Sequence, residues 1–164
     1  MRVFAVSGYS GTGKTSLVEA IVRSLVMRGH SVVTIKSSMH EVGPDQGSDT
    51  WKHRHAGASE TVFLGPSSES QKFRDRIGSQ KLAILEKYDF MIVEGMKSAN
   101  IPRFWCIGDG EINPTDVPMD TQVIVSWSER KPDVSEGIRI ISVDNIDELV
   151  EIVKNKSVDL MEIE

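Results

Sequence analysis

One short segment near the start of the chain carries the residues with the clearest chemistry. Residues 8–15 read GYSGTGKT, which fits the pattern G-x-x-x-x-G-K-[ST] and lies between a β-like run and a helical run. Glycines let backbone N–H groups turn inward around a phosphate, and a helix that begins directly after them adds positive potential. We therefore expect a phosphate-binding loop (P-loop) that binds a nucleoside triphosphate. Its expected members are Gly8, Tyr9, Ser10, Gly11, Thr12, Gly13, Lys14, Thr15 and Ser16.

Two P-loop residues and one distant carboxylate have separate expected roles. Lys14 is placed to reach the β- and γ-phosphates, and Thr15 to offer its hydroxyl to Mg²⁺. A triphosphate site also needs a carboxylate near the end of a neighbouring strand to hold the metal. Residues 88–95 read YDFMIVEG, so four apolar residues end at Glu94, where α/β sheets bind ligands. We predict that Glu94 holds Mg²⁺, and the alternative is a solvated carboxylate at a strand end.

Further polar residues follow in the middle of the chain. Asp45 and Asp49 are candidates to approach the metal, although Asp49 is equally suited to cap a helix N-terminus. His40 and Arg54 are candidates to contact phosphate or a partner ligand, with a solvated surface as the alternative. A zinc site is not expected, because His53 and His55 of one helix would point to different faces.

The remaining candidates concern packing and the choice of base. Trp105 and Cys106 lie inside a strand and are expected in the core, so Cys106 is not expected to act as a nucleophile. Trp127 follows a strand and suits either packing or ring stacking. Residues 130–133 read RKPD and keep the Lys and Asp spacing of the guanine-reading pattern N-K-x-D, so they are a candidate degenerate base contact. Residues 155–159 read NKSVD, which is one residue too long and follows a helix.

Short β-branched runs alternate with helical segments, which predicts an α/β fold. Several strands are apolar on both faces, as buried parallel strands are. The expected strands are residues 3–7, 31–35, 61–64, 90–93, 103–107, 122–125 and 138–142. The expected helices are residues 13–28, a short helix from residue 48 or 49, 79–87 and 146–154, with Gly29 capping the first. Residues 37–47 and 108–120 are expected to be irregular, within a single domain that spans residues 1–164.

Composition excludes several classes of protein. The chain has 19 Lys and Arg against 24 Asp and Glu, a formal charge of −5, which argues against binding driven by a nucleic-acid backbone. No apolar run approaches the roughly 20 residues that span a bilayer, and the first residues lack a signal-peptide profile. One cysteine in 164 residues fits a reducing compartment. We therefore expect a cytoplasmic protein that binds neither nucleic acid nor a membrane.

Three blocks of sequence resemble the MobB-type molybdopterin-guanine dinucleotide biosynthesis adaptor proteins. They are VSGYSGTGKT at residues 6–15, GSDTWKHRHAGA at residues 47–58 and VEGMK at residues 93–97, and the middle block is the distinctive one. The resemblance implies a P-loop NTPase-like, three-layer fold with a mostly parallel central sheet. It also implies GTP and Mg²⁺ as ligands, weak GTPase activity, a homodimer, and molybdopterin or its guanylyltransferase as partner. Beyond Lys97 the likeness is limited to the strand pattern.

The expected function is therefore that of a Mg·GTP-binding adaptor in molybdenum cofactor biosynthesis. Thr15, Glu94 and Asp49 are the expected metal residues, and the catalytic residue is unknown. No Gln, general base or arginine finger stands out, so we expect at most slow hydrolysis. Two alternatives are a P-loop kinase or synthetase acting on a small metabolite, and a non-catalytic module that senses a nucleotide.

Overall fold

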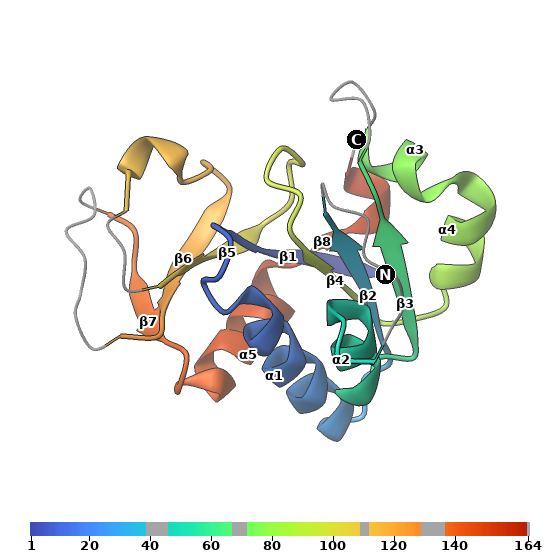
Figure 1. The fold of residues 1–164 in the computed structure, drawn as a ribbon. Helices are drawn as coiled ribbons and strands as arrows, with labels where there is room; N and C mark the ends of the chain where they lie inside the picture. Colours follow the sequence, from blue (N-terminus) through green and yellow to red (C-terminus); the bar gives the residue numbers. More distant parts are fainter. Residues whose placement is uncertain (39–45, 67–71, 109–111, 129–136, 164) are drawn as a thin grey trace.

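A central parallel sheet organises the computed structural model, which describes residues 1–38, 46–66, 72–108, 112–128 and 137–163 (Figure 1). The strands are β1 (Arg2–Gly8), β2 (Val32–Ser37), β3 (Glu60–Leu64), β4 (Phe90–Glu94), β5 (Arg103–Ile107), β6 (Thr121–Ser126), β7 (Ile140–Ser142) and β8 (Val158–Asp159). The helices are α1 (Lys14–Met27), α2 (Asp49–His55), α3 (Phe73–Ile77), α4 (Ser79–Leu85) and α5 (Ile146–Lys156), with 3₁₀ turns η1 (Pro114–Asp116) and η2 (Leu160–Glu162). Seven strands lie in the order β3-β2-β4-β1-β5-β6-β7, all parallel to their neighbours.

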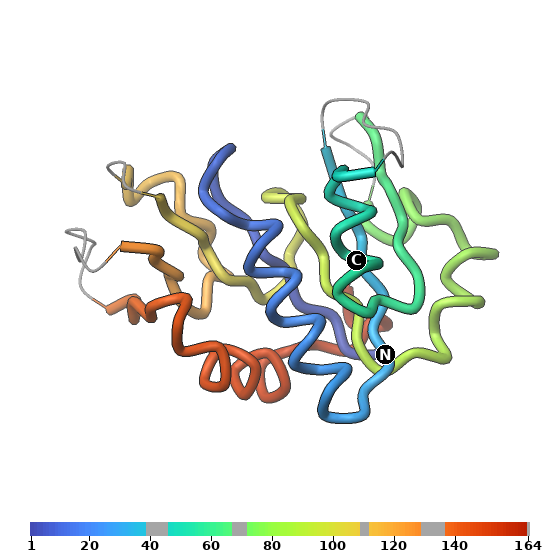
Figure 2. The backbone as a smooth tube through the Cα atoms, turned by 60° about the horizontal axis from the view of Figure 1, so that its bottom comes forward, coloured from blue at the N-terminus to red at the C-terminus, as the bar shows by residue number. Residues whose placement is uncertain are grey.

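The alternation of side chains along β1 explains the three layers. Phe4 and Val6 face a core with α1 and α5, whereas Val3 and Ala5 face a second core with α3 and α4. Figure 2 shows α1 and α5 side by side on the first face of the sheet. All of the inward positions of β1 are fully buried, as expected for a central parallel strand covered by helices on both faces.

The order of the strands places the P-loop and Glu94 side by side. β1 and β2 are consecutive in the chain and are connected through α1, but they are not neighbours in the sheet. The later strand β4 lies between them. β5 then continues on the other side of β1. Ligands of α/β sheets bind where connections leave in opposite directions, at the carboxyl ends of the strands. In this chain that position lies beyond Gly8 of β1 and Glu94 of β4.

The predicted strands and four predicted helices are confirmed within a few residues. Helix α1 ends as expected, because Gly29 has φ 86° and its N–H donates to the Val26 carbonyl at 2.9 Å. The sequence did not predict α3, β8, η1 or η2, which are each too short to show a periodic pattern, and η1 lies within residues 108–120, a range expected to be irregular. β8 pairs antiparallel with Arg2 and Val3, next to the part of β1 that β5 leaves free. None of the helices in the described ranges is long and apolar enough to cross a membrane.

Candidate nucleotide-binding site

The P-loop backbone has the shape that its glycines permit. Gly8, Gly11 and Gly13 have φ values of 145°, 74° and 79°, which disfavour residues with a side chain. A Cβ on Gly8 would overlap the backbone carbonyl of Cys106 and lie 3.0 Å from Thr12 Oγ1. A Cβ on Gly11 would meet no atom within 4 Å, so the loop is open on that side. The glycines thus hold a turn whose outer face is free for a ligand.

The start of α1 is left without the usual side-chain cap. Gly13 is the N-cap residue, no side chain accepts a hydrogen bond there, and the first turn contains no acidic residue. By contrast, Ser48 caps α2, and α5 carries two acidic residues in its first turn. The uncapped N-terminus of this 14-residue helix presents free N–H groups and the positive end of the helix dipole, and both suit a phosphate.

The side chain of Lys14 lies against this loop. Its ammonium group donates to the Tyr9 carbonyl, which also accepts from Thr12 Oγ1 at 2.9 Å. Burial lowers the pKa of Lys14 from its ordinary value of 10.5, because a half-buried ammonium loses water. The lysine is therefore held at the loop with a backbone carbonyl as its partner, and a phosphate would be a stronger one.

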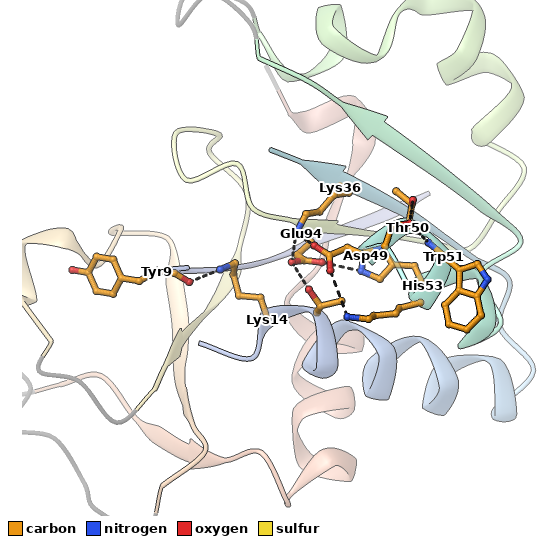
Figure 3. A network of polar contacts seen from close by, with 11 residues as sticks. Tyr9, Lys14, Lys36, Asp49, Thr50, Trp51, His53 and Glu94 are labelled. Atoms are coloured by element: carbon orange, nitrogen blue, oxygen red, sulfur yellow. Dashed lines mark hydrogen bonds and ion pairs between the residues drawn. The ribbon is translucent and has the colours of Figure 1, made fainter. Parts of the chain in front are cut away.

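The Tyr9 side chain points away from Lys14 and Glu94 (Figure 3). Its ring meets Trp105 edge to face with the centroids 5.6 Å apart, and its hydroxyl donates to Asp116. The Lys97 ammonium lies 4.9 Å from the centroid of the same ring. Ser10 and Ser16 are exposed at the loop. Tyr9 thus anchors the P-loop to β5 and η1 through its side chain, and only its backbone faces Lys14.

Glu94 is the centre of the polar network in Figure 3. Its side chain is almost fully buried at the end of β4. Oε1 accepts from Thr15 Oγ1 at 2.9 Å and from Lys36 Nζ at 2.5 Å. Oε2 lies 2.9 Å from His53 Nε2, which donates because an ionised carboxylate only accepts. The predicted pair of Thr15 and Glu94 is therefore in direct contact, and the alternative of a solvated carboxylate is wrong.

The charges around Glu94 explain its ionisation. Burial alone raises the pKa of a carboxyl group, but the hydrogen bond from His53 and the charge of Lys36 outweigh it and bring the pKa of Glu94 to about 2. Burial likewise lowers the pKa of Lys36, but the carboxylates of Glu94 and Asp49 raise it above its ordinary value. Both groups are thus charged at neutral pH, and their contact is an ion pair.

Asp49 joins this network through Lys36. Its Oδ2 lies 2.5 Å from Lys36 Nζ, and its Oδ1 lies 3.9 Å from Lys52 Nζ. The helix cap suggested as an alternative for Asp49 is instead Ser48, whose Oγ accepts from the Trp51 N–H at 3.3 Å. Two carboxylates therefore share the single ammonium of Lys36.

The histidines of α2 face opposite directions. His53 is fully buried against Glu94, and its Nδ1 has no hydrogen-bond partner in the described part of the chain. His55 is exposed and stacks on Trp51 with the ring centroids 4.0 Å apart, and Arg54 is exposed. His40, Asp45 and residues 130–133 lie outside the described residues. Across the described ranges, no three His, Cys, Asp or Glu side chains converge on a point.

A buried arginine holds the segment that follows Glu94. Gly95 has φ 94°, and a Cβ there would lie 2.6 Å from the Ser37 carbonyl oxygen; Met96 also has a positive φ, of 53°. Arg103, which is fully buried, donates to the carbonyls of Met96 and Lys97 at 3.1 and 3.2 Å and pairs with Asp120 at 2.6 Å. Arg103 thus holds the backbone at Met96, whose positive φ is unfavourable for a residue with a side chain.

Sequence reasoning missed Lys36, Arg103 and the role of His53. Lys36 carried a usable signal, since it is a lysine within an apolar strand, where an unpaired charge is not expected. Arg103 begins a strand and gave none, because its side-chain partners Ser7 and Asp120 are distant in the sequence and its remaining partners are backbone carbonyls, which any residue type supplies. Cys106 and Trp105 are fully buried as predicted, and burial raises the pKa of the Cys106 thiol to about 12.

The donor set at the junction of β1, α1 and β4 suits a hard divalent cation. Thr15 contributes a hydroxyl oxygen and Glu94 a carboxylate oxygen, and these are ligand types that Mg²⁺ prefers. The adjacent loop is open at Gly11 and lies at an uncapped helix end. This combination of a phosphate cradle and an oxygen pair fits a magnesium–triphosphate group.

Comparisons with known proteins agree with this geometry. Residues 3–129 match the family described as molybdopterin guanine dinucleotide synthesis protein B, or MobB. The chain belongs to the MobB family. The match contains the P-loop, the α2 segment, the Glu94 strand and Trp127.

Individual MobB relatives and solved structures extend the comparison. Adapter proteins of molybdopterin-guanine dinucleotide biosynthesis from Haemophilus influenzae and Escherichia coli are 32% identical over 109 residues and 29% identical over 142 residues, covering 62% and 77% of this chain. A Methanocaldococcus jannaschii relative is 37% identical over 117 residues, or 66% of this chain. The matched segment spans 48% of the Methanocaldococcus protein, 60% of the Haemophilus protein and 78% of the Escherichia coli protein.

The fold is shared more widely than the sequence. The crystal structure of Bacillus subtilis MobB has a TM-score of 0.65 at 19% identity, covering 96% of this chain and 99% of that chain. The hydrogenase maturation factor HypB from Archaeoglobus fulgidus has a TM-score of 0.64 at 12% identity, covering 94% and 89%. The predicted three-layer P-loop NTPase fold with a mostly parallel sheet is therefore confirmed for this MobB-family chain.

Proposed function

We propose that this MobB-family chain binds Mg·GTP at its P-loop and acts as an adapter in the synthesis of molybdopterin guanine dinucleotide. The observation that carries the proposal is the contact between Thr15 Oγ1 and Glu94 Oε1, 2.9 Å long, directly beside the uncapped N-terminus of α1. A hydroxyl and a carboxylate are the pair that holds the metal in P-loop proteins, and the helix end supplies N–H groups for the phosphates.

Each residue of the site has a defined task in this proposal. The backbone from Gly11 to Lys14 binds the phosphates, and Lys14 exchanges the Tyr9 carbonyl for a phosphate oxygen. Thr15 and Glu94 hold Mg²⁺, which neutralises part of the triphosphate charge. Since Glu94 Oε1 already contacts the Lys36 ammonium, a metal there competes with a like charge for one oxygen. Asp49, the second partner of Lys36, retains the lysine when this happens and stays near the metal.

Slow hydrolysis belongs to the same proposal. Phosphoryl transfer is accelerated by a positioned water and by charge stabilisation at the transferring group. The His53 ring donates to the buried carboxylate of Glu94 and is fully buried itself. It is thus engaged in holding Glu94 and is not free to activate a water. We infer that the chain retains and presents the nucleotide more than it consumes it.

The adapter role is supported by the relatives. Proteins from Haemophilus influenzae and Escherichia coli that match this chain are named as molybdopterin-guanine dinucleotide biosynthesis adapter proteins. We propose that this chain acts in the same way, as a homodimer, with molybdopterin or the enzyme that attaches GMP to it as partner. We propose GTP as the preferred nucleotide because molybdopterin guanine dinucleotide, the product of this synthesis, contains guanine.

Calorimetry with GTP and ATP, each with and without Mg²⁺, tests the nucleotide part. We expect Lys14→Ala to lower GTP affinity by about 100-fold, since the variant loses a charge-assisted bond of roughly 2–3 kcal/mol. Glu94→Gln should lower affinity only when Mg²⁺ is present. Lys81→Ala removes an exposed ammonium from α4, which packs on the face of the sheet opposite α1, and serves as the control. Unchanged GTP affinity in Lys14→Ala would contradict the P-loop assignment, and turnover of 1–100 s⁻¹ with a small metabolite would favour a kinase.

A further inference from the structure

Trp127 directly follows β6, and its ring lies on the P-loop. The residue is 44% exposed, although its side chain is one of the largest apolar groups of the chain. A Cβ added to Gly13 would overlap the indole, since it would lie 2.8 Å from Cζ2 and closer to Cε2 and Nε1. Gly13 therefore has no side chain for two reasons, its φ of 79° and the ring that occupies the space beside it.

The backbone that carries Trp127 is held on both sides. The Ser126 hydroxyl donates to the Ser128 carbonyl at 2.9 Å and accepts from the Ser128 N–H at 3.1 Å, so the residues on either side of Trp127 are joined. The Ser126 carbonyl also accepts from the Val143 N–H at 3.0 Å, which ties this turn to the segment after β7. The ring thus extends from a hydrogen-bonded strand end at the carboxyl edge of the sheet, the edge that also carries the P-loop.

The other two tryptophans differ from Trp127 in a way that matters. Trp105 is fully buried under the Tyr9 ring and belongs to the core. Trp51 is stacked on His55, so that one of its faces is already covered. Among the residues that the structure describes, Trp127 is the tryptophan that combines contact with a P-loop glycine and a large exposed area.

A nucleotide bound at this loop brings its base close to that ring. The backbone of a P-loop holds the α- and β-phosphates, and the base is joined to the α-phosphate through a single ribose. Aromatic side chains beside such a site stack on bases, because every base has a π-face and because indole loses little conformational entropy when it is already fixed. Stacking does not depend on hydrogen-bond edges, so it tolerates guanine and adenine alike.

We propose that Trp127 is a base-stacking platform of the nucleotide site, which supplies affinity for purine nucleoside triphosphates without selecting between guanine and adenine. This inference rests on the proposed function, since it requires a nucleotide at the P-loop. It assigns the phosphates to the loop and helix α1, and the base to the end of β6. That strand lies two places beyond β1 in the sheet, on the side opposite β4 and Glu94. Selection of guanine then requires groups other than this ring.

Calorimetry with three ligands separates the two assignments. GTP, ATP and inorganic tripolyphosphate are titrated, all with Mg²⁺, into the wild-type protein and into Trp127→Ala, Trp127→Phe and Trp51→Phe. We expect Trp127→Ala to lose roughly 10- to 100-fold in affinity for GTP and for ATP, the range of one aromatic–base stack, and to keep its tripolyphosphate affinity within about twofold. Trp127→Phe should retain most of the nucleotide affinity, and Trp51→Phe should bind all three ligands as the wild type does.

Intrinsic fluorescence supplies an independent readout of the stack. GTP should quench the emission of the wild-type protein and of Trp51→Phe, and the quenching should be absent in Trp127→Phe, whereas tripolyphosphate should leave the emission of all three unchanged. Unchanged GTP and ATP affinity in Trp127→Ala would overturn the platform and leave the P-loop assignment intact. Equal losses of GTP and tripolyphosphate affinity would also overturn it, because the ring would then only shape the loop. A wild-type protein that binds none of the three ligands would overturn both proposals.

Discussion

Replacing Glu94 by Gln changes one buried charge and little else. The glutamine has almost the same volume, and its amide oxygen can still accept from Thr15 and Lys36, but it carries no charge to form an ion pair with the Lys36 ammonium. In that orientation the amide NH2 group faces His53 Nε2, and the imidazole keeps this hydrogen bond only as the tautomer that carries its proton on Nδ1. The variant therefore isolates the electrostatic part of the network that Figure 3 shows.

The pKa of Glu94 gives the magnitude. It lies at about 2 instead of 4.5 in the folded protein, and each pKa unit corresponds to 1.36 kcal/mol. A lowered pKa stabilises the folded state above the unfolded-state pKa, and this stability is lost as the pH falls through the folded-state pKa. Glu94 thus contributes up to about 3 kcal/mol at pH 7, of which roughly 2 kcal/mol is lost by pH 3.

Urea unfolding between pH 7 and pH 3, without nucleotide or Mg²⁺, measures this contribution. We expect Glu94→Gln to be less stable than the wild type by about 2–3 kcal/mol at pH 7. The difference should narrow by roughly 2 kcal/mol at pH 3, because this pH lies between the two pKa values, where the Glu94 carboxyl takes up a proton on unfolding. Other carboxyl groups titrate in both proteins and cancel in the difference. A difference between the two proteins that stays constant across this pH range would refute the assignment of a strongly lowered pKa to Glu94.

Three further substitutions test the surroundings of the site. His53→Ala should lower the free energy of unfolding by about 2–4 kcal/mol in urea titrations, because it leaves a buried cavity and removes the hydrogen-bond donor to Glu94. His53→Gln, which keeps a donor, should lose less stability. Equal losses of stability in the two variants would argue against the hydrogen bond. Arg103→Met should lower the free energy of unfolding by about 3 kcal/mol, and Arg103→Lys should not restore it, because Asp120 and several carbonyls accept from a planar guanidinium group. Wild-type stability in Arg103→Lys would contradict this. Gly13→Ala should lower the free energy of unfolding by more than the roughly 1–2 kcal/mol that a positive φ costs, because the new Cβ also overlaps the Trp127 ring. In a double-mutant cycle, adding Trp127→Ala should remove the part of the loss that comes from this overlap and leave the part that comes from φ. Additive effects of the two substitutions would mean that the ring and residue 13 do not interact.

Much of the fold could be predicted from the sequence because its signals are local. Alternating and continuous apolar runs located the strands of the sheet, and Gly29 marked the end of α1 through a backbone torsion that other residues disfavour. Short elements escaped prediction for the same reason. The five residues of α3 carry only Phe73 and Ile77 as buried positions, which is a single i, i+4 pair and too little for a period.

The candidate site divides in the same way. The P-loop could be read directly, because glycine torsions, a helix start and a lysine follow one another within eight residues. Glu94 could be located at a strand end, but its neighbours could not. Lys36 is the partner of Glu94 because β2 and β4 are adjacent, in a register that pairs the two residues. β4 begins more than fifty residues after β2 ends, so no local pattern predicts this adjacency.

The sequence by itself therefore determined the phosphate loop, the α/β class and the carboxylate at the end of β4, since each depends on residues close together in the chain. Only the tertiary structure decided that Glu94 is held by three side chains, that Arg103 fixes the segment after it and that Trp127 lies on Gly13. These contacts follow from strand order and register, which are selected by the packing of the whole sheet against its helices, and no local pattern encodes them.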